Sequence, residues 1–261
     1  MLTKNERNSI KALRSKENRI RENRMVVEGI KGVVELLNSS LVTERIYITS
    51  DTDCPELKKL AFDKDIEICQ VSSKDMDIMS SLKKAPGVLA VGKPRIYDAK
   101  SICEFVLNQS NTSIPCMLML DDLNDPGNVG TLIRTAYWFG FAGVICSPRT
   151  SDVWNAKSIQ ASMGSVFNIP IAVAELTETI KSNQLNCAIL DASGENLYNS
   201  DVIPNAVIVG SESHGLSKGI RDLVQTVWAI PGSGEAESLN ASVAGAIVCS
   251  ELSRRWLASN T

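Results

Sequence analysis

The sequence predicts an α/β protein whose larger, C-terminal part is a parallel sheet covered by helices on both faces. Short apolar runs alternate with helical stretches along almost the whole chain of 261 residues, in the order that parallel sheets require. Several runs, such as residues 116–121, are nearly all apolar, which is typical of strands buried on both faces. With 44% hydrophobic residues, the chain is long enough for two globular domains.

The first predicted domain, residues 1–95, is a smaller α/β unit. A strand is expected over 25–28, and apolar residues at helical spacing from Ile30 to Leu37 predict the helix that follows. Ser72 or Ser73 is the expected N-cap of a later helix, and Pro94 ends the last strand because proline cannot donate to a sheet. The other expected elements are a strand at 45–50, a helix at 55–65, a strand at 66–72, a helix at 72–84 and a strand at 87–92.

Residues 96–113 are expected to be a linker, because a short helix near 102–107 is followed by a polar stretch. The second domain, residues 114–261, then carries the parallel sheet. Its last helix is expected over 238–256, with an apolar face formed by Leu239, Val243, Ala246, Ile247 and Leu252. Its expected strands are at 116–121, 143–147, 168–173, 187–192, 206–210 and 227–231.

Composition excludes several classes of protein. No run of about 18 apolar residues exists, so we expect no membrane span, and the N-terminus lacks the apolar core of a secretory signal. We therefore expect a cytoplasmic protein. The seven cysteines are odd in number and form no CxxC pair, which predicts reduced core residues and no metal site. The single histidine, His214, excludes a His-rich metal centre and makes a Ser-His-Asp hydrolase improbable.

Charge is unevenly distributed along the chain. The formal net charge is −3, but residues 1–31 carry nine Lys/Arg against four acids, a local charge of +5 on a body of −8. A basic segment on an acidic body favours a polyanionic partner met at one end. The alternative is a solvated helix whose charges only maintain solubility.

Three loops that follow expected strands are unusual, and in parallel sheets such loops bind ligands. The first, residues 121–136, leads directly into a helix and carries Asn128 at the helix start and Arg134 two turns later. It matches neither a dinucleotide fingerprint nor a Walker loop. Asn128 as a helix cap and Arg134 as a surface charge remain open as alternatives.

The second and third loops also combine small and polar residues. In residues 207–217 an apolar strand stops at Gly210, where the backbone can approach a ligand closely. A nucleophile elbow fails there because Ser211 stands at the position of the first glycine, and His214 is expected to be a hydrogen-bonding loop residue. In residues 230–244, Ser238 and Asn240 open the last helix, where each either caps the helix or turns outward to a ligand.

The three loops together resemble the SpoU (TrmH-like) branch of the SPOUT RNA methyltransferases. The patterns are N-x-G-x-x-x-R-T-A from Asn128, V-G-S-E-x-x-G-L-S from Val209 and I-P-x-x-G-x-x-x-S-L-N-x-S-x-A from Ile230, in this order. The resemblance covers residues 114–261. The first domain, with VVEGIKGVVELL and KAPGVLAVGKP, resembles the L30e-like domain that holds RNA in many members.

The resemblance implies a deep trefoil knot, a homodimer formed through the knotted domain, and S-adenosylmethionine as the cofactor, with no metal. It implies transfer of a methyl group to a ribose 2′-OH of RNA. The implied cofactor-binding residues are Gly210, Ser211, Glu212, Ile230, Leu239 and Asn240. The implied catalytic residues are Asn128, Arg134, Glu212, Ser238 and Asn240.

Chemistry limits the role of Arg134, because a guanidinium stays protonated below about pH 12. We expect it to fix a phosphate beside the target ribose and to stabilise the developing alkoxide, so that a phosphate oxygen or water takes the proton. An L30e-like domain favours large-subunit (23S) rRNA as the substrate, with tRNA second. A non-catalytic RNA-binding or ribosome-assembly protein is the alternative. A Rossmann oxidoreductase is disfavoured, because the sequence contains no G-x-G-x-x-G motif. The target nucleotide, and a housekeeping as against an antibiotic-resistance role, stay open.

Overall fold

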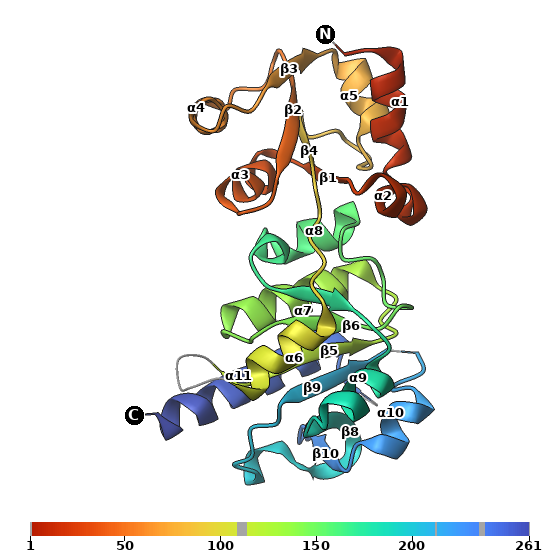
Figure 1. Ribbon diagram of the computed structural model, residues 1–261, viewed down its shortest axis with the longest axis vertical. Coiled ribbons are helices and arrows are strands. Elements are labelled where there is room, and N and C mark those ends of the chain that lie inside the picture. The colour runs from red at the N-terminus through yellow and green to blue at the C-terminus, as the bar shows by residue number, and fades with distance from the viewer. Residues whose placement is uncertain (1, 109–113, 212, 235–237, 261) are drawn as a thin grey trace. The chain divides into compact units, whose positions relative to one another are not determined.

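The computed structural model describes residues 2–108, 114–211, 213–234 and 238–260 (Figure 1). The chain forms two compact units. Unit 1 comprises the residues up to Arg95 together with Asp152–Asn168, and unit 2 comprises Ile96–Ser151 and the residues from Ile169 onward. The division after Arg95 coincides with the expected domain boundary, whereas residues 152–168 had been expected in the second domain. Within unit 1, Asp152 forms an ion pair with the buried Arg19.

Unit 1 is built on a four-stranded mixed sheet in the order β1-β4-β2-β3. β4 is antiparallel to both of its neighbours, and β2 and β3 are parallel. The strands are β1 (Met25–Glu28), β2 (Thr43–Thr49), β3 (Ile68–Val71) and β4 (Val88–Gly92). The helices are α1 (Lys4–Ala12), α2 (Lys16–Glu22), α3 (Ile30–Asn38), α4 (Pro55–Asp63), α5 (Ser73–Met79) and α8 (Ala156–Ser162), with a short 3₁₀ turn at Ser165–Phe167.

Side-chain hydrogen bonds fix where α5 begins and ends. The expectation of Ser72 as the N-cap is confirmed, since its hydroxyl accepts from the backbone N–H of Asp75. The helix ends at Met79, five residues earlier than the sequence pattern predicts. Beyond it, Ser80 and Ser81 donate instead to the carboxylate of Glu28, which holds this segment in an extended conformation.

The basic N-terminal segment is part of the folded unit. Ile10 and Leu13 are buried in its core, and three arginines form ion pairs inside it. These pairs are Arg7–Asp75 at 2.6 Å, Arg19–Asp152 at 2.5 Å and Arg24–Glu44 at 2.6 Å. Much of the charge excess read from the sequence is therefore used within unit 1.

Unit 2 contains the expected parallel sheet, which is confirmed. Six strands pair in the order β10-β8-β9-β5-β6-β7, and every pairing is parallel. The strands are β5 (Met117–Asp121), β6 (Val144–Cys146), β7 (Ile171–Val173), β8 (Cys187–Asn196), β9 (Ala206–Gly210) and β10 (Thr226–Ala229). The helices are α6 (Ala99–Leu107), α7 (Pro126–Trp138), α9 (Leu176–Asn183), α10 (Lys218–Leu223) and α11 (Ala241–Ser259), with a 3₁₀ turn, η2, at Leu197–Asn199. The trefoil knot implied by the resemblance stays a prediction.

Helices cover both faces of this sheet, as expected. α6, α9 and α10 share one apolar core with Met117, Met119 and Ile208 of the central strands. α7 and α11 pack against each other and against β5 and β9. The short helix expected near 102–107 is confirmed as α6, but it is not part of a linker, because its Ile102, Cys103 and Val106 are buried in that core.

The buried face of α11 differs from the expected one. Val243 is 47% exposed and Leu239 lies just before the helix at 49% exposed. The residues that pack inward are Ala241, Ser242, Gly245, Val248, Cys249, Glu251, Leu252 and Arg255. α11 is apolar around most of its circumference, so its periodicity alone does not determine which side faces α7.

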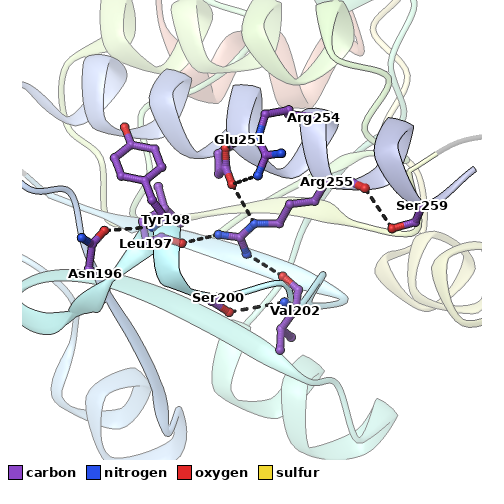
Figure 2. Close-up of polar contacts among 9 residues, drawn as sticks. All are labelled: Asn196, Leu197, Tyr198, Ser200, Val202, Glu251, Arg254, Arg255 and Ser259. Atoms are coloured by element: carbon purple, nitrogen blue, oxygen red, sulfur yellow. Dashed lines mark hydrogen bonds and ion pairs between the residues drawn. The ribbon is translucent and has the colours of Figure 1, made fainter. Parts of the chain in front are cut away.

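Arg255 anchors the end of α11 to the segment between β8 and β9 (Figure 2). Arg255 is 4% exposed, and its guanidinium donates to the carbonyl oxygens of Leu197 and Val202 and to the Glu251 carboxylate. It also lies 5.0 Å from the centroid of the Trp228 ring. Hydrogen bonds from Arg254 and Arg255 hold the pKa of Glu251 below its usual value.

We expect Arg255→Met to lower the free energy of unfolding by about 2–3 kcal/mol. The substitution leaves two carbonyl oxygens without their donor, while Glu251 keeps its ion pair with Arg254. Denaturant unfolding of the two proteins measures the difference. Arg254→Met is the matched control, since Arg254 is 63% exposed, and its stability should equal that of the wild type. Equal stability of both variants would contradict the anchoring role of Arg255.

The cysteines all lie in the cores of the two units and are free thiols. Burial raises the pKa of Cys103 to about 11 and those of Cys187 and Cys249 to about 12, so these thiols stay protonated at neutral pH. Among the helices of the described residues, none is long and apolar enough to cross a membrane.

Candidate functional site

The first two polar loops of unit 2 follow β5 and β9, from which the chain continues toward opposite edges of the sheet. β5 and β9 are neighbours, and their last residues, Asp121 and Gly210, pair with each other. From β5 the chain continues through α7 to β6, and from β9 it continues through α10 to β10 on the opposite side of the sheet. Such a switch in direction opens a crevice at the carboxyl ends of the strands, which is where α/β sheets bind ligands.

The first loop leads into α7, and Asn128 is not its cap. The carboxylate of Asp125 accepts from the backbone N–H of Asn128 at 3.0 Å, and Pro126 occupies the first turn. The capping alternative for Asn128 is therefore wrong. Asn128 is half-buried and belongs to the first turn of the helix. Arg134 is exposed and makes no hydrogen bond or ion pair with any residue that the structure describes.

The second loop folds back tightly on the end of β9. Ser211 and Gly215 exchange two backbone hydrogen bonds, of 3.0 and 2.8 Å, and Ser211 is 5% exposed. A Cβ on Gly210 would lie 2.6 Å from the carbonyl carbon of Gly215 and 2.7 Å from the N of Leu216. Only glycine allows this close approach. Glu212, expected to serve both cofactor and catalysis, lies outside the described residues.

Two residues that the sequence patterns did not single out hold the second loop in place. Asp121 is 3% exposed, and its carboxylate accepts from the backbone N–H of Ser217 at 2.7 Å. Arg221 of α10 donates to the carbonyl oxygen of Leu216 at 3.2 Å. The sequence does contain a signal for Asp121, because an acid that directly ends an apolar strand is placed at the carboxyl edge of the sheet.

We expect Asp121→Ala to lower the free energy of unfolding by about 1–2 kcal/mol, because the Ser217 N–H loses its acceptor in a partly buried position. Asp121→Asn keeps an acceptor oxygen and should lose less than half of that. Chemical denaturation monitored by circular dichroism measures both changes. Asp222→Ala, on the exposed side of α10, is the control and should have little effect. If the alanine and asparagine variants are equally destabilised, the hydrogen bond is not what holds the loop.

The third loop leads into α11 and presents its expected residues at the surface. Asn240 is the N-cap, since its Oδ1 accepts from the N–H of Ser242 at 2.9 Å and of Val243 at 3.4 Å. The capping interpretation of Asn240 is thus confirmed. Ser238 and Leu239 are exposed and Ile230 is half-buried. Within the described residues, no hydrogen bond links Arg134 to Ser238 or Asn240.

The arrangement as a whole favours binding by backbone groups and small polar side chains. The chain enters α7 from β5 and α11 from β10, and all strands of this parallel sheet have their carboxyl ends at one edge. No three His, Cys, Asp or Glu side chains gather as metal ligands among residues 2–108, 114–211, 213–234 and 238–260. Arg134 is exposed and has no hydrogen bond or ion pair among the described residues, so its guanidinium suits an anionic group such as a phosphate.

Comparisons with known families match both units. The model described as the SpoU rRNA Methylase family matches residues 115–250, which cover the three loops. The model described as an MRM3-like substrate binding domain matches residues 5–90.

Individual relatives match over nearly the full chain. A Mycolicibacterium paratuberculosis protein described as an uncharacterized tRNA/rRNA methyltransferase is 34% identical over 88% of this chain and 77% of its own length. The AdoMet-bound rRNA methyltransferase from Sinorhizobium meliloti is 25% identical, with a TM-score of 0.82 over 97% of this chain and 96% of that one. The SpoU methyltransferase AviRb from Streptomyces viridochromogenes shares the fold, with 21% identity, a TM-score of 0.84 and coverage of 96% and 97%.

Proposed function

We propose that this chain, which belongs to the SpoU rRNA methylase family, transfers a methyl group from S-adenosylmethionine to a ribose 2′-OH of RNA, with 23S rRNA preferred over tRNA. The observation that carries the proposal is the site at the β5–β9 switch point. There β9 ends at Gly210 in a tightly folded loop, and the neighbouring β5 leads into α7, which carries the exposed Arg134. Transfer of an activated methyl group to a ribose oxygen needs no metal or covalent nucleophile, so the site must mainly position the two reactants.

The residues of the second and third loops fit S-adenosylmethionine chemically. The cofactor has a flat purine, ribose hydroxyls and a charged amino-acid group, and when bound it supplies an activated methyl on a sulfonium. Ile230 and Leu239 offer apolar surface for the purine. The missing side chain of Gly210 lets a ligand approach the backbone closely, and Ser211, Glu212 and Asn240 are the further binding residues of these loops.

In the proposed mechanism, Arg134 binds the phosphate next to the target ribose with its two-pronged guanidinium. This contact fixes the 2′-oxygen in line with the methyl group and stabilises the charge that develops as its proton leaves. A phosphate oxygen or water accepts the proton. Asn128 and Ser238 orient the ribose, while Asn240 holds the start of α11 through its cap. Glu212 is the remaining residue of the proposed catalytic set.

The preference for rRNA rests on unit 1. Residues 5–90 match a substrate-binding domain, and the exposed cations of unit 1 include Lys4, Lys11 and Arg14. A separate domain that holds a large, structured RNA lets the catalytic unit stay acidic while a few arginines position the target.

Purified protein incubated with S-adenosylmethionine and either 23S rRNA or tRNA tests the proposal. Nuclease digestion and mass spectrometry should find one new methyl group on a ribose, formed faster on 23S rRNA. A methyl group on a base would refute the 2′-OH target, and a faster reaction on tRNA would refute the rRNA preference. Absence of both transfer and S-adenosylmethionine binding would support the non-catalytic RNA-binding alternative.

We also propose that the enzyme is a homodimer formed through α7 and α11. Tyr137, Trp138, Leu239, Val243 and Leu257 are 47–81% exposed on and beside these two helices. A groove of about 550 Å³ runs between them, lined among others by Val243, Ala246 and Ile247. Exposed apolar surface of this kind is typical of a protein interface, and a second copy supplies the same helices.

We expect Val243→Glu to convert the dimer to a monomer, because it places a charge in the apolar groove. Light scattering coupled to size exclusion measures the mass. Val173→Glu is the matched control, since Val173 on β7 is also 47% exposed but does not line the groove, and it should leave the mass unchanged. A Val243→Glu protein of unchanged mass would contradict this interface.

A further inference from the structure

A cavity of about 440 Å³ lies within unit 1, apart from the loops of the candidate site. Its walls come from α1 and α2, from the segment after α5 and from the start of α8. The apolar part of its lining consists of Ile10, Leu13, Val26, Met79, Leu82, Trp154 and Ala156. Its volume is in the range of pockets that hold a small organic group.

The wall after α5 is fixed from two sides. Glu28 accepts hydrogen bonds from the hydroxyl of Ser80 and from the N–H and hydroxyl of Ser81, the last two at 2.9 and 2.5 Å. Arg14 of the N-terminal segment donates to the carbonyl oxygens of Ile78, at 3.0 Å, and Ser80. This segment brings Lys83 to the edge of the cavity, so the hydrogen bonds that hold the segment also fix the position of Lys83.

A second part of the lining is held by a buried ion pair. Arg19 is 6% exposed, and its Nε lies 2.8 Å from the carboxylate of Asp152. The same carboxylate accepts from the backbone N–H of Trp154 at 3.0 Å, which places the indole in the lining. Asn155 then caps α8 by accepting from Ser158, and this brings Lys157 to the edge.

Trp154 has an unmet hydrogen-bonding requirement. The residue is 6% exposed, and its indole Nε1–H is buried without an acceptor among the described residues. A buried donor without a partner costs about 1–3 kcal/mol, so proteins rarely retain one. A ligand that carries carbonyl oxygens or ring nitrogens would supply the missing acceptor.

The edge of the cavity is cationic. Arg14, Lys83 and Lys157 are exposed there. The one lining carboxylate, Glu28, is occupied by the two serines, and the charge of Arg19 is balanced by Asp152. An apolar, aromatic floor with a cationic edge suits a ligand that is flat and apolar in one part and anionic in the other.

We propose that this cavity binds a single unstacked nucleotide of the RNA substrate, with the base against Trp154 and the flanking phosphates on Lys83 and Lys157. The proposal rests on RNA being the substrate, as argued above. Single-stranded RNA is recognised through bases that are splayed out and stacked on aromatic side chains. A duplex keeps its bases paired and cannot enter, so the cavity would select an unpaired site in a folded RNA.

Binding of fluorescent octauridylate to the full chain, measured by anisotropy over a range of salt concentrations, tests the proposal. Lys83→Ala/Lys157→Ala should weaken binding about tenfold and reduce the salt slope by about 1.4, since each phosphate contact contributes about 0.7 for single strands. Trp154→Phe keeps a ring but removes the N–H, so it should weaken binding about three- to tenfold with the salt slope unchanged. Lys58→Ala/Lys59→Ala, on exposed positions of α4, is the matched control and should bind as the wild type does.

Two further results would overturn the nucleotide site. An octamer with abasic positions should bind more weakly than octauridylate, and equal binding would show that only phosphates are recognised. Equal effects of the two double-lysine variants would show a general cationic surface.

Methyl transfer is measured on the same proteins, and the cavity variants should raise the KM for RNA while the KM for S-adenosylmethionine stays constant. An active wild type whose cavity variants keep the RNA KM refutes the cavity alone, and an inactive wild type with the predicted binding pattern refutes the methyltransferase function alone.

Discussion

Arg134→Ala should lower the kcat of methyl transfer about 10²–10³-fold while the affinity for S-adenosylmethionine stays within about twofold of the wild type. In the proposed mechanism this guanidinium contacts the RNA phosphate and the reacting 2′-oxygen and does not contact the cofactor. Arg134 is exposed and has no partner among the described residues, so its removal leaves no buried group unpaired. The unfolding midpoint should therefore be unchanged.

Arg134→Lys separates charge from geometry. Lysine keeps the positive charge but lacks the planar pair of donors that holds a phosphate from two sides. We expect it to recover less than a tenth of the wild-type kcat, and Lys181→Ala, which removes an exposed cation on α9, to leave kcat unchanged. Calorimetry measures the affinity for S-adenosylmethionine, and single-turnover kinetics with RNA measure the rate of methyl transfer. Full turnover of the lysine variant would refute the two-pronged phosphate contact.

Gly210→Ala should weaken S-adenosylmethionine binding by about 30- to 150-fold, which corresponds to roughly 2–3 kcal/mol of overpacking. The added methyl would lie 2.6–2.8 Å from backbone atoms of Gly215 and Leu216, and backbone cannot rotate away as a side chain can. The loop from Ser211 to Ser217 must move to accommodate it, and the groups that bind the cofactor move with it.

The third loop offers a matched control. A Cβ on Gly232 meets nothing within 4 Å, so Gly232→Ala adds the same methyl group in open space. Its affinity for S-adenosylmethionine should stay within about twofold of the wild type. Calorimetric titration of both variants gives the comparison. Equal affinities would mean that the close packing at Gly210 does not control the cofactor site.

The sequence predicted the catalytic sheet well because its strands are buried on both faces and so carry a strong local signal. β9 begins and ends where expected, and β5 and β10 lie within two residues of the expected ranges. The second loop begins at the carboxyl edge of the sheet, as expected, where Gly210 of β9 pairs with Asp121 of β5. The common site of the three loops stays a prediction.

The differences arise where distant contacts override a local pattern. The burial of α11 depends on its contact with α7, which selects Gly245, Val248 and Leu252 over the equally apolar Val243. Residues 152–168 join unit 1 through the Arg19–Asp152 pair, whose members are 133 residues apart. The role of Asp121 also depends on a hydrogen bond across 96 residues. Periodicity and capping rules describe neighbours in sequence and carry no information on such contacts.

The central claim, methylation of a ribose in 23S rRNA, is tested most directly by mapping 2′-O-methyl groups in the rRNA of a strain that lacks the gene. Exactly one site should lose its methyl group, and the wild-type gene, but not one encoding Arg134→Ala, should restore it. An rRNA map identical to that of the parent strain would contradict the account.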